Sequence, residues 1–186
     1  TVYAGASYGQ VFRTTDSGTT WSLANEGLTH PGTGYDYSQV YALAVSPSTQ
    51  TTLYAAIAGT SSDPTVDDGV FRTTDSGETW TRADAGLPIY SNSVRTLAVD
   101  PSRSATVYAG SAGRGVFRSL DGGATWVSVG PERSYVSTLA FADSTPPVLY
   151  AATDGGLFRS TDSGQTWIPS NVGLPVSPYP GIGLIT

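Results

Sequence analysis

The stretch TTDSGETW at residues 73–80 decides the fold, because close copies of it recur along the chain. The copies are TTDSGTTW at 14–21, SLDGGATW at 119–126 and STDSGQTW at 160–167. Their aspartates, which are separated by 59, 46 and 41 residues, are Asp16, Asp75, Asp121 and Asp162. A period of about 40 to 50 residues indicates a propeller or a solenoid built from one repeated unit.

The sequence around each copy also repeats. Directly before the copies lie QVFR, GVFR, GVFR and GLFR, and before those lie VYAG, LYAA, VYAG and LYAA. A third set, VYALAVS, VRTLAVD and VSTLAFA, begins at Val40, Val94 and Val136. Each run is short, rich in β-branched and aromatic residues, and bounded by Gly, Pro, Ser or Asp, as strands are. Together with the run that starts at the Trp, they make a unit of four antiparallel strands, which is the blade of a β-propeller.

The predicted fold class is therefore all-β, a single propeller of four-stranded antiparallel blades over residues 1–186. Blade 2 spans residues 40–84, blade 3 spans 94–130 and blade 4 spans 136–171. Blade 1 combines residues 1–25 with a closing strand at 181–186, because the chain begins at a second strand. Gly181 and Gly183 are unfavourable inside a strand. Two alternatives therefore stay open: the last strand completes a blade of a neighbouring chain, or these residues are part of a larger propeller.

Composition excludes several classes of function. The net charge is -6, the isoelectric point is near 4.4, and the nine basic residues are scattered arginines. Nucleic acid binding needs clustered positive charge, so no nucleic acid partner is expected. The chain has no Cys and one His, His30, which argues against disulfides and zinc. No apolar run approaches the roughly 20 residues of a membrane helix, so no membrane insertion is expected.

The pattern S/T-x-D-x-G-x-T-W, present four times, resembles the Asp-box or bacterial neuraminidase repeat. Similar repeats occur in sialidases, xyloglucan-cleaving hydrolases, sortilin-type receptors, photosystem II assembly factors and many secreted proteins. The resemblance implies a propeller and leaves the function open, because one repeat serves such different proteins. It also implies that the boxes lie on hairpins between third and fourth strands, on the face opposite the usual ligand face. The expected location is extracellular or periplasmic, with any signal peptide outside these residues.

A structural role explains why the box recurs. Asp followed by Ser-Gly or Gly-Gly predicts a tight turn in which the carboxylate accepts backbone N–H groups and the Gly adopts a positive φ. The Trp rings are expected to be buried between strands. The box residues given this role are Asp16, Gly18, Trp21, Asp75, Gly77, Trp80, Asp121, Gly123, Trp126, Asp162, Gly164 and Trp167.

No catalytic residue is predicted. A glycosidase needs one pair of carboxylates across one bond, which equivalent aspartates on separate blades do not provide. The arginines three residues before each box Asp, which repeat with the blades, are expected to form interblade hydrogen bonds and ion pairs: Arg13, Arg72, Arg118 and Arg159. The predicted function is a non-catalytic binding or structural module with a glycan or protein partner. The alternative is a fragment or relative of a glycoside hydrolase.

Chain direction predicts where a ligand would bind. The connections that enter first strands, and those between second and third strands, must lie on the face opposite the boxes. The candidate ligand residues on this face are Tyr8, Tyr35, Tyr37, Tyr90, Arg114, Tyr135, Asp154 and Tyr179. Tyrosines suit sugars or a polar protein epitope, although they could instead pack the loops over the channel.

Calcium is the one metal for which the sequence offers candidate ligands. Asp63, Asp67 and Asp68 carry the oxygen ligands that Ca²⁺ prefers. Their spacing does not match the twelve-residue calcium loop, and a solvated turn is the preferred interpretation. No cofactor is expected.

Overall fold

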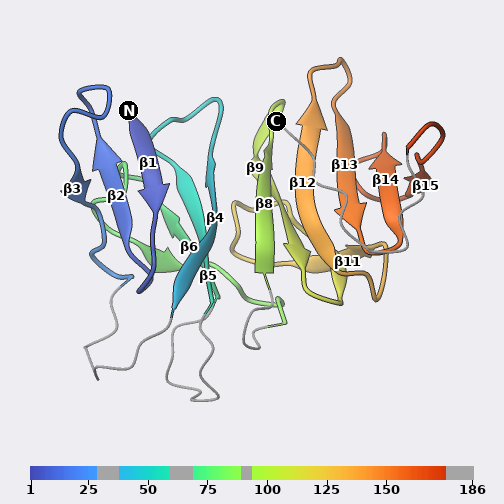
Figure 1. Ribbon diagram of the computed structural model, residues 1–186, viewed down its shortest axis with the longest axis horizontal. Coiled ribbons are helices and arrows are strands. Elements are labelled where there is room, and N and C mark those ends of the chain that lie inside the picture. Colours follow the sequence, from blue (N-terminus) through green and yellow to red (C-terminus); the bar gives the residue numbers. More distant parts are fainter. Residues whose placement is uncertain (29–37, 59–68, 89–93, 175–186) are drawn as a thin grey trace.

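The computed structural model describes residues 1–28, 38–58, 69–88 and 94–174 of the chain. These residues form fifteen strands and no helix, grouped into four antiparallel sheets (Figure 1). Within them, no helix has the length and apolar character of a membrane span. The predicted fold class, an all-β chain of propeller blades, is confirmed.

The sheets follow the sequence repeat, with strands paired in chain order in each. Blade 1 contains β1 (Val2–Gly5), β2 (Val11–Thr14) and β3 (Ser22–Leu23). Blade 2 contains β4 (Gln39–Val45), β5 (Leu53–Ala58), β6 (Gly69–Thr73) and β7 (Thr81–Arg82). Blade 3 contains β8 (Val94–Asp100), β9 (Arg103–Ser111), β10 (Gly115–Ser119) and β11 (Val127–Gly130). Blade 4 contains β12 (Val136–Ala142), β13 (Val148–Thr153), β14 (Gly156–Ser160) and β15 (Ile168–Pro169).

Burial explains the residue types along each blade. The second strand of blade 2, β5, is buried along its whole length and reads LYAAIA, an unbroken apolar run. Such a run is expected where both faces of a strand are covered. The outermost strands β3, β7 and β15 have only two residues each, and these are exposed. Each starts one residue after the box Trp.

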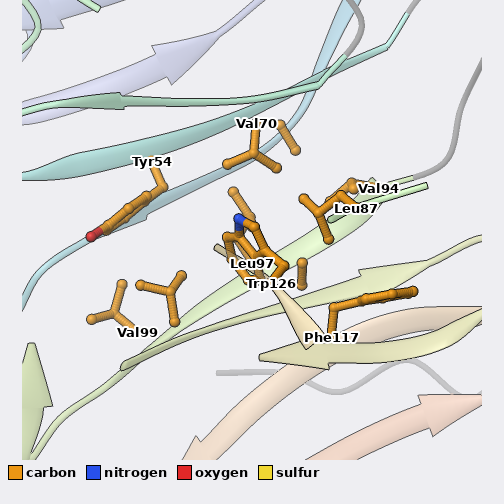
Figure 2. Packing of buried hydrophobic residues seen from close by; sticks show 11 residues of the cluster. Tyr54, Val70, Leu87, Val94, Leu97, Val99, Phe117 and Trp126 are labelled. Carbon is orange, nitrogen blue, oxygen red and sulfur yellow. The ribbon is translucent and has the colours of Figure 1, made fainter. Parts of the chain in front are cut away.

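The hydrophobic core lies between blades. One cluster joins blades 1 and 2 through residues that include Val11, Leu28 and Trp80. A second joins blades 2 and 3, with Trp126 among Tyr54, Val70 and Leu97 (Figure 2). A third joins blades 3 and 4 around Tyr108 and Leu149. The stability of each blade therefore depends on its neighbours.

The described blades form an open arc, with blades 1 and 4 at opposite ends (Figure 1). The inner strands β4, β8 and β12 lie side by side, and β1 lies against β4. Blade 1 shows three strands. Val2 is 53% exposed on β1, whereas its repeat equivalents Leu53, Val107 and Leu149 are fully buried. The closing strand predicted at residues 181–186 lies outside the described residues and stays a prediction.

Candidate functional site

Each Asp-box is a turn closed by its own side chains. In blade 3, Asp121 Oδ1 accepts the backbone N–H of Thr125 at 2.9 Å, and Oδ2 accepts the Thr125 hydroxyl at 2.5 Å. The Ser119 hydroxyl donates to Oδ1 at 2.7 Å and accepts the Gly123 N–H at 2.8 Å. The same bonds recur in the other three boxes. The hydroxyl groups are thus as much a part of the motif as the carboxylate.

These bonds hold the box carboxylates ionised. The Thr125 hydroxyl and backbone N–H, followed by the Ser119 hydroxyl, lower the pKa of Asp121 to about 2. The pKa of Asp162, through Thr166, and of Asp75, through Thr73 first, is also about 2. Bonds from Thr20 lower the pKa of Asp16 further. A general acid must hold a proton near neutral pH, so none of the four is suited to that role.

The box Trp joins its blade to the preceding one. The indole N–H groups of Trp80, Trp126 and Trp167 donate to the carbonyls of Ala24, Ala83 and Val129 at 3.0, 2.9 and 2.9 Å. Trp80 and Trp126 are 3% and 4% exposed, but Trp21 is 44% exposed. The expectation that all four rings are buried is therefore wrong for Trp21. Trp80 and Trp126 each pack on the preceding blade, and no blade within the described residues packs on Trp21.

The arginine row also joins neighbouring blades. Arg13 Nη1 donates to the Ser76 carbonyl at 3.1 Å and lies 3.9 Å from Glu78 Oε1. Arg118 Nη1 donates to the Ser163 carbonyl at 2.7 Å. Each bond runs from one blade to the box turn of the next, which is the role expected from the sequence, for Arg13 and Arg118.

The face opposite the boxes carries the loops that enter first strands and those that join second to third strands. Isolated bridges pair Ser7 with Gln39 and Ala112 with Tyr135. They show that the loop between second and third strands of one blade lies beside the start of the first strand of the next. The predicted ligand residues in such connections, Tyr8, Arg114, Tyr135 and Asp154, therefore share a face.

Two of these residues are brought into contact. The Tyr135 N–H donates to Asp154 Oδ1 at 3.0 Å, and the Asp154 N–H donates to the Tyr135 carbonyl at 3.1 Å. Tyr8 is 64% exposed at a φ of +61°, and the exposed Arg114 donates its N–H to the Ser111 hydroxyl. Four other candidate ligand residues, Tyr35, Tyr37, Tyr90 and Tyr179, lie outside the described residues.

The candidate calcium ligands Asp63, Asp67 and Asp68 also lie outside the described residues, as does His30. Among the residues that the structure describes, no group of three or more His, Cys, Asp or Glu side chains is arranged to hold a metal ion.

A β-bulge marks the same position in three neighbouring inner strands. The register shifts between Val40 and Ala42, between Val94 and Thr96, and between Val136 and Thr138. The residues at the bulges are Tyr41, Arg95 and Ser137. A bulge bends its strand and re-aims a side chain, and bulges are over-represented next to functional sites.

The Arg95 side chain lies next to two tyrosine rings. Its guanidinium carbon lies 4.3 Å from the ring centre of Tyr41 and 5.9 Å from that of Tyr135. Its Nε is buried and makes no hydrogen bond within the described parts of the chain. Tyr41, Arg95 and Tyr135 are called the aromatic–arginine cluster below. A guanidinium stacked on a ring keeps its edge N–H groups for a planar anion such as a carboxylate.

Sequence reasoning missed Tyr41 and Arg95. The signal was present: in VYALAV, VRTLAV and VSTLAF the second residue changes to Tyr, Arg or Ser, while the Val before it and the Leu-Ala two residues after it repeat. When one residue varies inside an otherwise repeated run, the fold that the repeats share does not require that residue type.

Comparison with known proteins identifies the fold. No protein-family model matches the chain. No curated protein matches its sequence. Among solved structures, the chain is similar to a GH74 xyloglucanase from Xanthomonas campestris, with 25% identity and a TM-score of 0.68 over 93% of this chain and 29% of that one. An ancestral GH74 enzyme matches with 20% identity and a TM-score of 0.65 over 91% and 23% of the two chains.

A third match is YCF48 bound to D1 peptide, with 15% identity and a TM-score of 0.62 over 90% of this chain and 50% of that one. The chain thus spans about a quarter to a half of the length of these three proteins. All three are β-propeller proteins, so the fold of this chain is that of propeller blades.

Proposed function

We propose that the chain is a non-catalytic binding module whose partner docks on the aromatic–arginine cluster. The partner is a protein segment that presents a carboxylate to Arg95. The observation that carries the proposal is the placement of Arg95, on a bulge and beside two tyrosine rings.

The surroundings of the cluster favour a polar, extended partner. Tyr135 is 40% exposed and lies next to the Asp154 carboxylate. A peptide can therefore place an acidic group on Arg95 and a backbone or side-chain donor on Asp154. Tyr offers apolar area with a hydrogen-bonding tip, which is why it is common in interfaces. YCF48, which has a similar fold, is bound to the D1 peptide in its structure, and this supports a protein partner for blades of this kind.

A glycan is the second candidate, and the similarity to a GH74 xyloglucanase at 25% identity favours it. Tyrosine rings can stack on sugar rings as well as on peptide groups. Secreted proteins with similar repeats support an extracellular or periplasmic location in either case.

The absence of catalysis is part of the proposal and rests on the box geometry. The box carboxylates are saturated by hydrogen bonds within their own turns, and their pKa values are lowered. A glycosidase acid instead needs a raised pKa and an open approach to the substrate.

Binding assays with a library of acidic peptides and with a glycan array test the proposal. We expect Arg95→Gln to weaken peptide binding about tenfold or more, because a hydrogen bond to a charged group contributes about 1.5–3 kcal/mol. Arg103→Gln, on the box face beside Ser163, is the matched control and should leave binding unchanged. Peptide binding that Arg95→Gln leaves intact contradicts the site, and binding to glycans alone favours the second candidate.

A further inference from the structure

The loop that joins blade 3 to blade 4 differs from the loops that follow blades 1 and 2. After those two blades a four-residue turn, NEGL or DAGL, accepts the backbone N–H of the next box Trp. The Trp80 N–H, for example, donates to the Glu26 carbonyl at 2.8 Å. Blade 3 is followed instead by residues 130–135 (GPERSY). Within the described parts of the chain, this loop accepts no bond from the Trp167 N–H, so its sequence is not set by a bond to the next box.

The loop packs instead on another loop of blade 3, residues 112–115, which joins β9 to β10 on the face opposite the boxes. The Gly115 N–H donates to the Ser134 carbonyl at 3.0 Å. A Cβ atom on Gly115 would collide with the Pro131 carbonyl, so Gly permits this close approach. Residues 112–115 and 130–135 are called the paired loops below.

Positive charge is concentrated at the paired loops. The chain has nine basic residues, all of them Arg, and a net charge of -6. Six lie in the arginine row, in the outermost strand β7 or on the box face: Arg13, Arg72, Arg82, Arg103, Arg118 and Arg159. The remaining three, Arg95, Arg114 and Arg133, all belong to blade 3 and the loop that follows it. Such a local concentration of positive charge on an acidic protein attracts acidic groups.

Arg133 has no role in the fold that explains its residue type. Its φ is +58°, a conformation that Gly adopts without strain and a bulky side chain does not. Among the described residues other than Gly, only the box serines, Tyr8 and Arg133 have a positive φ. The Arg133 side chain is exposed and makes no hydrogen bond or ion pair within the described residues. Backbone strain of this kind is typical of functional positions.

We propose that the partner segment carries two acidic groups, one bound by Arg95 and the second bound by Arg133. This inference rests on the proposed function, because it concerns the same partner. Arg95 contacts the Tyr135 ring, and Arg133 lies two residues before Tyr135, so a segment that crosses this ring can reach both guanidinium groups. A guanidinium binds a carboxylate through two parallel N–H donors, which suits Arg better than Lys at both positions.

Two carboxylates of the protein limit where the acids of the partner can lie. Glu132 and Asp154 are both exposed, and Asp154 Oδ1 accepts the Tyr135 N–H at 3.0 Å. A partner acid placed against either carboxylate would be repelled, and such repulsion contributes to specificity. We therefore expect the two acids to be separated by uncharged or basic residues rather than to belong to an unbroken acidic run.

Double-mutant cycles test the inference. The probe is the tightest binder from the library of acidic peptides, with each of its acids changed in turn to the amide. Arg95→Gln and Arg133→Gln should each weaken binding about tenfold or more, and each should abolish the effect of neutralising one acid, a different acid for each arginine. Arg103→Gln removes the same charge from an exposed position on the box face and should leave binding unchanged.

The outcomes separate this inference from the proposed function. Weaker binding with Arg95→Gln alone, coupling of both arginines to one acid, or a tightest binder with a single acid would overturn the second contact and leave the proposed function standing. Full binding by Arg95→Gln, or a library without a binder, would overturn both.

Arg133→Gly distinguishes a binding role from a structural one. Because Gly adopts the φ of this position without strain, the substitution should not lower the midpoint of thermal unfolding. It should nevertheless weaken peptide binding as much as Arg133→Gln does. A midpoint that falls while binding is retained would assign Arg133 to the fold and overturn the inference.

Discussion

Boxes 1 and 3 share a sequence pattern and a hydrogen-bond network but have different surroundings. In both, the Asp carboxylate accepts a backbone N–H four residues later at 2.9 Å and the hydroxyl of the same residue. Trp126 is nevertheless buried against blade 2, whereas Trp21 is 44% exposed. The turn is therefore a local structure that each repeat forms alone. The hydrophobic stabilisation of the Trp belongs to a pair of blades.

The largest expected effect separates these two tryptophans. Trp126→Ala should lower the free energy of unfolding by about 3–5 kcal/mol, because it empties the centre of a buried cluster and removes an indole hydrogen bond. Trp21→Ala should lower it by only about 0.5 kcal/mol in the monomer, as for a surface substitution.

Urea unfolding of both variants, at a concentration where the chain is monomeric, measures the difference. Equal losses would show that Trp21 is buried in the monomer, in contradiction to the open arc.

Two glycines, in the turns that end blades 1 and 4, sharpen the comparison with a smaller effect. Gly27 and Gly173 have positive φ values of +88° and +85°, so Ala costs about 1 kcal/mol at either from backbone strain. At Gly27 the new methyl group also meets the Trp80 carbonyl, which adds about 1–3 kcal/mol of overpacking. Thermal unfolding should therefore show a clearly larger loss for Gly27→Ala. A loss at Gly173 as large as that at Gly27 would mean that a blade already covers the last turn.

The fold was predictable because its information is repeated. Four copies of the box and its flanking runs indicate the strands, their order and the blade. A strand assignment that is ambiguous in one repeat is resolved by the aligned runs in the others. The exposure of Trp21 was not predictable in this way. Its sequence is equivalent to that of Trp80, and the difference arises from the position of blade 1 at the end of the arc.

The candidate site was predictable only in part. Chain direction placed Tyr135 and Asp154 on one face, and the structure pairs them through two hydrogen bonds. Arg95 was missed because strand alternation alone does not reveal a bulge, which depends on the register between β8 and β9. Tyr41 was missed for the same reason, because it occupies the bulge of β4.

The smallest expected effect concerns pH, and here boxes 1 and 3 should behave alike. The folded-state pKa of Asp121 is about 2, and that of Asp16 is lower still, against roughly 3.9 in an unfolded chain. A carboxyl group whose pKa is lowered by folding stabilises the protein fully above the unfolded pKa and loses this contribution as pH falls through the folded pKa. The urea midpoint should therefore fall between about pH 4 and pH 2. Asp121→Asn and Asp16→Asn should each make this decline shallower, because each removes one of four titrating boxes, although both retain an acceptor for the turn N–H. A midpoint that stays constant from pH 5 to pH 2, or a decline that neither substitution changes, would show that the box carboxylates are not the groups that couple stability to pH.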